Sequence, residues 1–317
     1  MSKNTFKPSN EHLKCAPSKT IDAKNNTCFT TDQLIKMVES YNKHIKNKDK
    51  EIIINKQQFL TDSELKKYLL SELIKKLPKT CKSQECLLKE DFVVHLKDFD
   101  LLYNTLRPLG PIKKTKWLSS SDINQIIVQY TLKYPEFKFF GALPIDFEEI
   151  ELPINYKTNV FYNTLCNMYK NNIYKIGFVL NLDKHNESGS HWVALYTNLK
   201  DKQIYFFDSY GYKPKTEIIK LMSIIAYWIN SNNCDSIKEY NLQDYSLYFK
   251  NGICNNYPNI DIKYNNIRHQ FKNSECGVYS VNFIIRLLLD HTFNEIINEK
   301  TSDDDINSCR KIYFRFE

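Results

Sequence analysis

In the first hundred residues of the chain, the hydrophobic positions recur with a helical period. They do so over 31–41, behind a threonine cap, and over 65–77, behind the capping box formed by Thr61 and Glu64. A third helical run covers about 89–106 and ends before a proline, which disfavours helical geometry in the residue that precedes it. The spacing therefore predicts a small, purely helical region.

The polar segments on either side of this region set the expected domain boundaries. Residues 1–27 are polar and contain two prolines, so we predict a disordered N-terminal segment. Two prolines, a glycine and a basic cluster interrupt all periodicity over 107–116, which is typical of a linker. We expect a helical arm domain over 28–106 and a second domain over 117–317.

After the linker the pattern changes to a mixture of helices and apolar, β-like runs. The runs are rich in Ile, Val, Tyr and Phe and are separated by polar turns, as in strands of a sheet. The expected elements are a helix at 121–130, strands at 173–181, 192–197 and 204–207, a helix at 215–230, a strand at 260–264 and a helix that begins at Cys276. This order predicts an α+β domain of about 200 residues.

Composition limits the class of protein. The chain has 317 residues, of which 42% are hydrophobic and 14% aromatic, enough for a packed core. No apolar run reaches the ~18–20 residues that a membrane span needs. The N-terminus lacks the apolar stretch of a secretory signal. We expect a soluble, intracellular protein without membrane contact.

The nine cysteines form an odd and scattered set in a long chain. This argues against a disulfide framework and for a reducing compartment. Cys81 and Cys86 are close in sequence, but no second Cys or His pair at zinc spacing accompanies them. We interpret them as a structural pair or as unrelated residues, and we expect no metal and no cofactor.

Charge is unevenly distributed along the chain. Residues 1–116 carry 23 Lys and Arg against 14 Asp and Glu, a net charge of +9, whereas residues 117–317 have a net charge of −2. A basic module of this kind can contact DNA or an acidic partner. The favoured interpretation is a solvated, lysine-rich helical surface.

One segment near the C-terminus has the features of a nucleophile site. Cys276 lies at the start of a long apolar helix, whose positive end favours a thiolate. Gln270, six residues earlier, could stabilise an oxyanion together with the backbone N–H of Cys276. His191 begins a strand after a flexible turn and could take the proton of the thiol. Asp208 ends the next strand and could orient His191 if the two strands pair.

Each of these residues has an ordinary structural alternative. A buried cysteine before a helix is usually inert, and an aspartate that ends a strand is usually a turn residue. A single histidine at a strand start is more often structural. The joint pattern, in the chain order His, Asp, Gln, Cys, is what favours a catalytic set.

This joint pattern resembles the cysteine proteases that process ubiquitin-like proteins, the SUMO-protease class, and their viral relatives such as the adenovirus and African swine fever virus proteases. The order excludes the papain arrangement, in which the cysteine comes first. The likeness covers about 117–317, and over 1–116 it weakens to a similar helical arm. The African swine fever virus relative has Asn where this chain has Asp208, and Asp is the commoner choice in the wider family. The matching segments are 179–183, 189–194, 266–270, 275–277 and the tail 310–316.

The resemblance implies a papain-like fold of the ubiquitin-like-protein protease type and a cysteine endopeptidase activity. It further implies cleavage of viral structural polyproteins after Gly-Gly, in the virion and in the viral factory of the host cytoplasm. Trp192 would be a wall of the substrate groove, or packing beneath the site. Two alternatives remain open: a protease that removes ubiquitin or ubiquitin-like tags, and a basic nucleic-acid-binding virion protein without activity.

Overall fold

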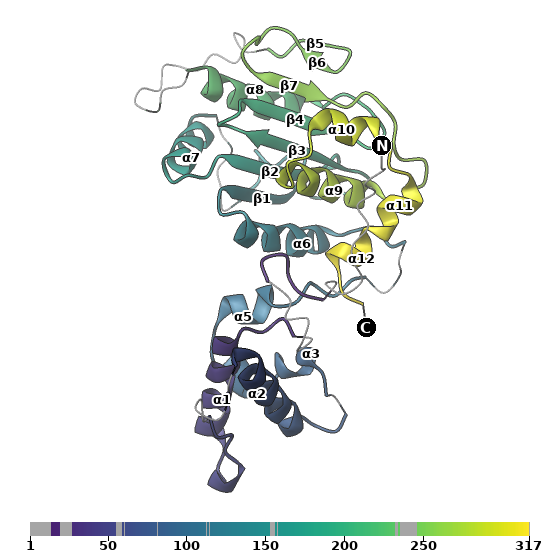
Figure 1. Cartoon of the computed structure of the whole chain (residues 1–317). Coiled ribbons are helices and arrows are strands. Elements are labelled where there is room, and N and C mark those ends of the chain that lie inside the picture. The colour runs from purple at the N-terminus through teal and green to yellow at the C-terminus, as the bar shows by residue number, and fades with distance from the viewer. Residues whose placement is uncertain are drawn as a thin grey trace. The chain divides into compact units, whose positions relative to one another are not determined.

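The computed structural model describes residues 14–19, 27–54, 59, 61–80, 82–111, 113, 115–152, 156, 158–231, 234 and 246–316. The chain divides into two compact units. The first, the arm unit, consists of residues 1–109 and 312–317, and the second, the sheet unit, of residues 110–311. Figure 1 shows the helices of the arm unit in purple and blue and the strands of the sheet unit in teal and green.

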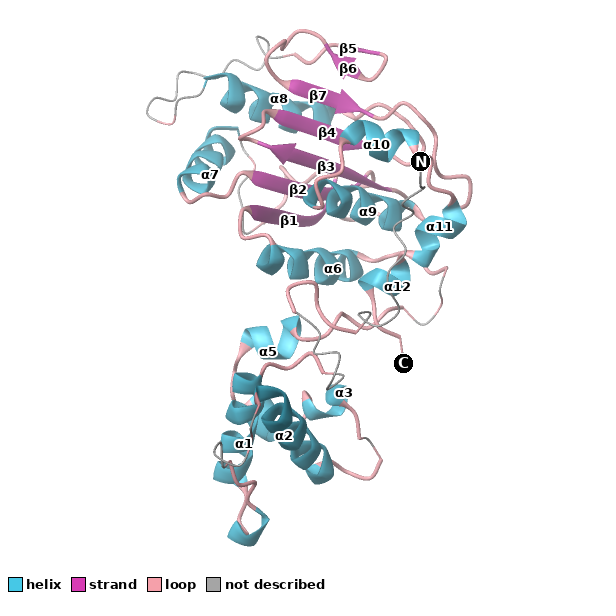
Figure 2. Cartoon of the chain, in the orientation of Figure 1, coloured by secondary structure: helices cyan, strands magenta, loops and turns pink. Residues whose placement is uncertain are grey.

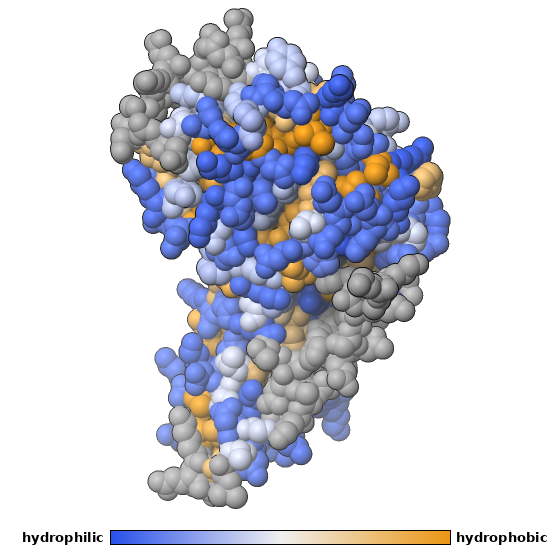
Figure 3. All heavy atoms as spheres, turned by 45° about the horizontal axis from the view of Figure 1, so that its top comes forward, coloured by the Kyte–Doolittle hydropathy of each residue, from blue (hydrophilic) through white to orange (hydrophobic). Residues whose placement is uncertain are grey.

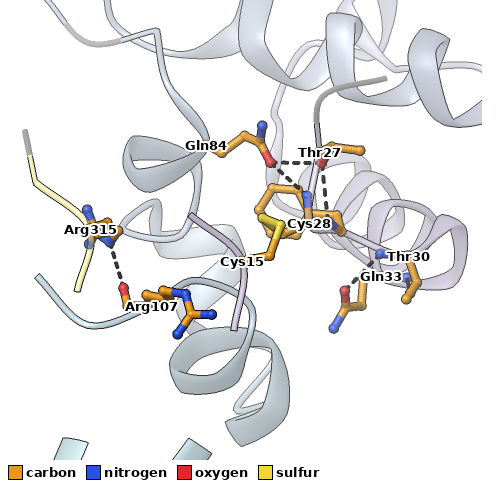
Figure 4. The surroundings of a disulfide bond; sticks show 9 residues. Cys15, Thr27, Cys28, Thr30, Gln33, Gln84, Arg107 and Arg315 are labelled. Atoms are coloured by element: carbon orange, nitrogen blue, oxygen red, sulfur yellow. Dashed lines mark hydrogen bonds between the residues drawn. A yellow bond between two sulfur atoms is a disulfide. The ribbon is translucent and has the colours of Figure 1, made fainter. Parts of the chain in front are cut away.

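The boundary between the units lies within the predicted linker 107–116, but the last six residues differ from the expectation. We predicted them to be part of the second domain, whereas they group with the arm unit. The reason is a pair of hydrogen bonds from Arg315 to backbone carbonyls. Its backbone N–H donates to the Pro108 carbonyl at 3.0 Å. Its side-chain Nε donates to the Arg107 carbonyl at 2.9 Å (Figure 4).

Two of the three helices expected in the arm are present. Helix α1 spans Thr31–His44 and begins with a capping box between Thr30 and Gln33. Helix α2 spans Asp62–Lys76 and begins with the predicted capping box, Thr61 with Glu64. Between them lies the short 3₁₀ helix η2, Lys48–Lys50. The apolar faces of α1 and α2 pack into one small core with buried side chains such as Leu34 and Leu69.

The prediction of one helix over 89–106 is wrong, because the chain breaks into short helices there. These are α3 (Gln84–Leu87), α4 (Asp91–Val94) and α5 (Phe99–Asn104). Lys97 adopts a positive φ of 51°, which no α-helix accommodates. Asp98 then caps the next helix by accepting a hydrogen bond from the Leu101 N–H at 3.0 Å.

The segment 14–19 is ordered, which corrects the prediction of a disordered region over 1–27 for these residues. Cys15 forms a disulfide with Cys28, with a Cα–Cα distance of 5.3 Å (Figure 4). Backbone bonds join the same segment to the end of α5: the Ala16 N–H donates to the Thr105 carbonyl and the Arg107 N–H to the Lys14 carbonyl. Residues 1–13 and 20–26 lie outside the described residues.

The expectation that no disulfides form is also wrong. Besides the first bridge, Cys166 pairs with Cys234, with a Cα–Cα distance of 5.6 Å. Cys86 is disulfide-bonded too, while Cys81 lies outside the described residues. The prediction rested on the number of cysteines and their scatter along the sequence, and neither says which extended segments the fold places side by side.

The sheet unit is built on one seven-stranded sheet with the strand order β1-β2-β3-β4-β7-β6-β5 (Figures 1 and 2). Strands β2, β3 and β4 form an antiparallel meander, and β1 and β7 join its two edges in parallel. The sequence analysis missed β1, β5 and β6. The bounds are β1 Phe137–Pro144, β2 Lys175–Asn181, β3 Trp192–Asn198, β4 Gln203–Phe207, β5 Phe249–Lys250, β6 Ile253–Cys254 and β7 Asp261–Tyr264.

Helices cover both faces of the sheet (Figure 2). On one face, α7 (Thr158–Lys170) and α8 (Thr216–Ser231) enclose the main core with inward side chains such as Val193 and Phe206. On the other face lies α9 (Cys276–Leu288), where Phe283 stacks on Phe207 with ring centroids 4.9 Å apart. This face also carries α6 (Ser120–Lys133) and α10 (Phe293–Asn298), and the chain continues through α11 (Asp303–Ser308) and α12 (Arg310–Tyr313).

On the face shown in Figure 3, hydrophilic residues predominate and hydrophobic ones form small, separate patches. Among the described residues, no helix combines the length and apolar character needed to cross a membrane.

Candidate active site

The hairpin of β3 and β4 brings His191 and Asp208 together, as the sequence predicted. His191 directly precedes β3 and Asp208 directly follows β4. The antiparallel register pairs Ala194 with Phe207, so both ends meet at the same edge of the sheet. The imidazole Nε2–H donates to Asp208 Oδ1 over 2.7 Å, with both side chains buried. Because Nε2 makes this bond, Nδ1 is the ring nitrogen that is available for a second hydrogen bond.

Asn265 fixes the position of Asp208, and the sequence analysis missed it. Its Oδ1 accepts the Asp208 N–H at 2.8 Å and its Nδ2 donates to the Asp208 carbonyl at 2.7 Å. The Tyr210 N–H donates to Asp208 Oδ1 at 2.8 Å. Asn265 follows β7, which pairs in parallel with β4, so the two strand ends lie side by side. A polar residue directly after a short strand was the only available signal.

Cys276 is the first residue of α9, and it contacts His191. Burial by itself lowers the pKa of His191, but hydrogen bonds to Asp208 and to Cys276 outweigh this and raise the pKa to about 9. His191 is therefore an imidazolium at neutral pH, and an adjacent imidazolium favours a thiolate. No side chain caps the start of α9, so the positive end of the helix is directed at the nucleophile.

We expect Asp208→Asn to lower the pH at which His191 loses its charge. The raised pKa of His191 means that its charge is present at neutral pH and is lost as pH rises through about 9. An amide at 208 removes the negative charge that raises this pKa, so this pH should fall by roughly one to three units. The measurement is the NMR titration of the His191 ring as a function of pH.

The matched control for this experiment is Asp201→Asn. Asp201 lies in the turn at the far end of the same hairpin and accepts a hydrogen bond from Asn198. Its replacement should leave the pH profile unchanged. An identical profile for wild type and Asp208→Asn would contradict the assigned role of Asp208.

Gln270 is fully buried, and its side-chain amide is held in one orientation. Its Oε1 accepts a hydrogen bond from Ser209 Oγ at 2.7 Å, and its Nε2 donates to the Lys272 carbonyl at 2.8 Å. The Ser209 carbonyl also accepts the Gln270 N–H at 2.9 Å. The amide NH₂ has a second hydrogen, and this N–H can donate the hydrogen bond that an oxyanion requires. Ser209, next to Asp208 in sequence, thus joins the two halves of the site.

A second network, made of hydrogen bonds to Glu275 and Ser274, holds the start of α9 in place. Glu275 is buried and its carboxylate accepts hydrogen bonds from the Ser274 N–H at 2.8 Å and from Asn307 Nδ2 at 2.7 Å. Arg310 donates to both Asn307 Oδ1 and the Ser274 carbonyl. The residue before the cysteine is therefore anchored to α11 and α12, which the sequence gave no means to foresee.

Trp192 packs beneath the first turn of α9. Its indole N–H donates to the Leu118 carbonyl at 2.9 Å, and the side chain is 8% exposed. A Cβ on Gly277 would lie 3.3 Å from Trp192 Cδ1 and 3.1 Å from Leu118 Cβ, so a side chain here would require these neighbours to shift by a few tenths of an ångström. The role of Trp192 as a groove wall stays a prediction. Within the described ranges, no group of three or more His, Cys, Asp or Glu is placed to hold a metal ion.

Comparison with known proteins is consistent with this geometry. Residues 178–315 match the Ulp1 protease family, C-terminal catalytic domain. A protein of Acanthamoeba polyphaga mimivirus that is named as a thiol protease is 35% identical over 310 residues, which cover 95% of this chain and 93% of the relative. The SUMO-1 cysteine protease of African swine fever virus is 26% identical over 281 residues, which cover 84% of this chain and 94% of the viral protein. The crystal structure of the African swine fever virus protease aligns with a TM-score of 0.55 at 23% identity, over 86% of this chain and 94% of that one, and has the same fold.

Proposed function

Because the chain belongs to the Ulp1 family of cysteine proteases, we propose that His191, Asp208 and Cys276 are its catalytic triad and that it cleaves viral structural polyproteins after Gly-Gly pairs. The observation that supports the triad is the position of His191, in contact with Asp208 on one side and Cys276 on the other. The alternative of a nucleic-acid-binding virion protein without activity does not agree with the family. We propose the virion and the viral factory as the place of action.

The geometry supports a sequence of steps with defined proton positions. The Cys276 thiolate attacks the carbonyl carbon of the scissile bond, and the Gln270 amide and the backbone N–H of Cys276 stabilise the oxygen that becomes negative. The imidazolium of His191 then gives its proton to the leaving amine, and the acyl-enzyme forms. Neutral His191 next takes a proton from water, which hydrolyses the thioester. Asp208 keeps the imidazole ring in place through both steps.

Burial of the nucleophile supports the preference for glycine. Cys276 is 3% exposed and His191 is 9% exposed. Trp192 packs against the first turn of the helix that begins at Cys276. A scissile peptide must therefore approach closely with its backbone. Residues without side chains before the cut allow this approach. The same argument fits the C-terminal Gly-Gly of a ubiquitin-like tag.

Removal of such tags is the second candidate function, favoured by the name of the African swine fever virus relative, a SUMO-1 cysteine protease. The deciding experiment incubates the purified protein with a Gly-Gly-containing capsid polyprotein and, separately, with ubiquitin-like conjugates. Cleavage of the polyprotein at Gly-Gly supports the first function. Cleavage of the conjugates alone would replace it with the second.

The basic arm carries a separate prediction about DNA. Four exposed lysines gather at the end of α1 and in η2, and none has an ion-pair partner among the described residues: Lys43, Lys46, Lys48 and Lys50. If this cluster binds DNA phosphates, replacing all four by glutamine should weaken DNA binding. The slope of log K against log salt should become shallower by about three to four.

The control for the arm replaces four exposed lysines of the sheet unit by glutamine: Lys138, Lys170, Lys184 and Lys250. Both variants lose the same charge, so only a specific contact separates them. Equal weakening in the two variants would indicate nonspecific attraction and remove the case for the arm.

A further inference from the structure

The catalytic imidazole is the first member of a stack of side chains that reaches the protein surface. Tyr210 lies on His191, with ring centroids 4.7 Å apart and an interplanar angle of 24°. The guanidinium carbon of Arg268 lies 5.2 Å from the centroid of the Tyr210 ring and 5.0 Å from that of Phe271. We call Tyr210, Arg268 and Phe271 the Arg268 stack.

The arginine in this stack is held in place. Its Nε donates to the Gln270 carbonyl at 2.8 Å. The aromatic rings of Tyr210 and Phe271 both lie near its guanidinium carbon. Its backbone is fixed as well, because Gly211 has a φ of +79° and a Cβ there would lie 2.8 Å from the Ile267 carbonyl carbon. The turn after β4 therefore packs directly on the segment that carries Arg268, and the stack keeps its position relative to His191.

The same arginine lacks a charge partner. Neither terminal nitrogen of its guanidinium has a hydrogen bond or an ion pair among the described residues, and the residue is exposed. Two acidic residues whose charges act on Tyr210, the stacking partner of Arg268, are otherwise engaged: Asp208 accepts from His191 and Tyr210, and Asp303 accepts from the N–H groups of Phe271 and Lys272. An arginine fork fixed by stacking, with both terminal nitrogens open, is suited to bind a carboxylate through two hydrogen bonds.

The surroundings of Arg268 indicate a binding surface. Phe271 is 71% exposed and Tyr212, 6.1 Å from Tyr210 between ring centroids, is 66% exposed. Large aromatic side chains that are this exposed next to a catalytic group are typical of surfaces that a partner covers. Burial, and after it the charge at Cys276, raises the pKa of Tyr210, whereas Arg268 lowers it. The charges of both Cys276 and Arg268 thus act on this tyrosine.

We propose that Arg268 binds an Asp or Glu side chain of the substrate, within about three residues of the scissile bond. The steps of 4.7 and 5.2 Å place the guanidinium within about 10 Å of the His191 ring. An extended peptide rises ~3.3 Å per residue, so this distance corresponds to about three residues. The proposal rests on the proposed peptidase function and adds to it a determinant of specificity.

The test uses pairs of Gly-Gly peptides that carry Glu or Gln at one position within three residues of the cut, on either side. Wild type should cleave one Glu peptide with a kcat/KM roughly 10–100-fold above its Gln partner, mainly through KM. Arg268→Gln should lose this preference and cleave the Glu and Gln peptides of each pair with equal kcat/KM. Arg268→Glu should prefer the matching Lys peptide. Lys213→Gln removes an exposed positive charge from the neighbouring turn and should keep the preference.

The outcomes separate this proposal from the function on which it rests. If wild type cleaves every Glu and Gln pair equally, the proposal is overturned while cleavage after Gly-Gly stands. An equal loss on both peptides in Arg268→Gln, through kcat, would assign the stack a structural role and overturn the proposal as well. If wild type cleaves no Gly-Gly peptide, the proposed function itself fails.

Discussion

Replacing Cys276 by alanine will abolish peptide-bond cleavage, with a loss in kcat/KM of at least about 10⁴-fold. Without the thiol there is no nucleophile, and His191 and Gln270 can only polarise a bond that water must attack unaided. The measurement is the hydrolysis of a peptide with a Gly-Gly cleavage site, followed by mass spectrometry of the products. His191→Ala should produce a loss of similar size, because the two residues act as one unit.

The control is a second free cysteine in the same unit. Cys309 is buried, and burial raises the pKa of its thiol to about 11, so it stays a protonated, inert thiol at neutral pH. Cys309→Ala should keep the cleavage rate near that of wild type. Iodoacetamide at neutral pH should modify Cys276 first. A Cys276→Ala protein that folds normally and still cleaves would disprove the assignment of the nucleophile.

The sequence could predict the His191–Asp208 pair because local rules determine it. Two adjacent apolar runs joined by a short polar turn form a hairpin, and the residues at its open ends then meet. The position of Cys276 followed for a similar reason, since a cysteine that opens a long apolar helix lies at the positive end of that helix. These parts of the site depend on neighbours in sequence.

The residues that hold the site in place could not be predicted, because they depend on contacts between distant segments. Asn265 reaches Asp208 only because β7 pairs in parallel with β4, and nothing in either short run specifies that pairing. Ser209 and Gln270 are 61 residues apart. Arg310 reaches the start of α9 from a helix that the periodicity did not reveal.

The errors in the fold have related causes. Strand β1 (Phe137–Pro144) was missed because a glycine and a proline interrupt its pattern. Its pairing with β2 stabilises it nevertheless, and this pairing continues on both sides of a register shift between Phe139 and Ala142. Propensity is a weak guide where tertiary pairing decides. The order of residues 14–19 was missed because the segment was judged by its polar composition, whereas a backbone bridge from Cys15 to Leu106 and the disulfide to Cys28 hold it.

Replacing Gln270 by alanine should lower kcat by about 10²–10³-fold and leave KM nearly unchanged. The expected loss is in kcat because the amide N–H acts on the oxygen only when negative charge develops there. The effect is separate from that of the triad, since His191 and Cys276 keep their contact in this variant. The rate of Cys276 alkylation should therefore remain close to that of wild type, and single-turnover kinetics should place the defect in the formation of the acyl-enzyme.

Two companion variants test whether the loss comes from the amide itself. Ser209→Ala removes the hydrogen bond to Gln270 Oε1 but keeps the amide, so its defect should be much smaller, at about tenfold or less. Gln270→Glu has nearly the same shape but presents a carboxylate, which repels a developing oxyanion, so it should be at least as slow as Gln270→Ala. If Gln270→Glu retained wild-type kcat, the oxyanion would have to be stabilised by backbone N–H groups at the start of α9 alone, and Gln270 would be a structural residue that joins the Ser209 turn to the segment before the nucleophile.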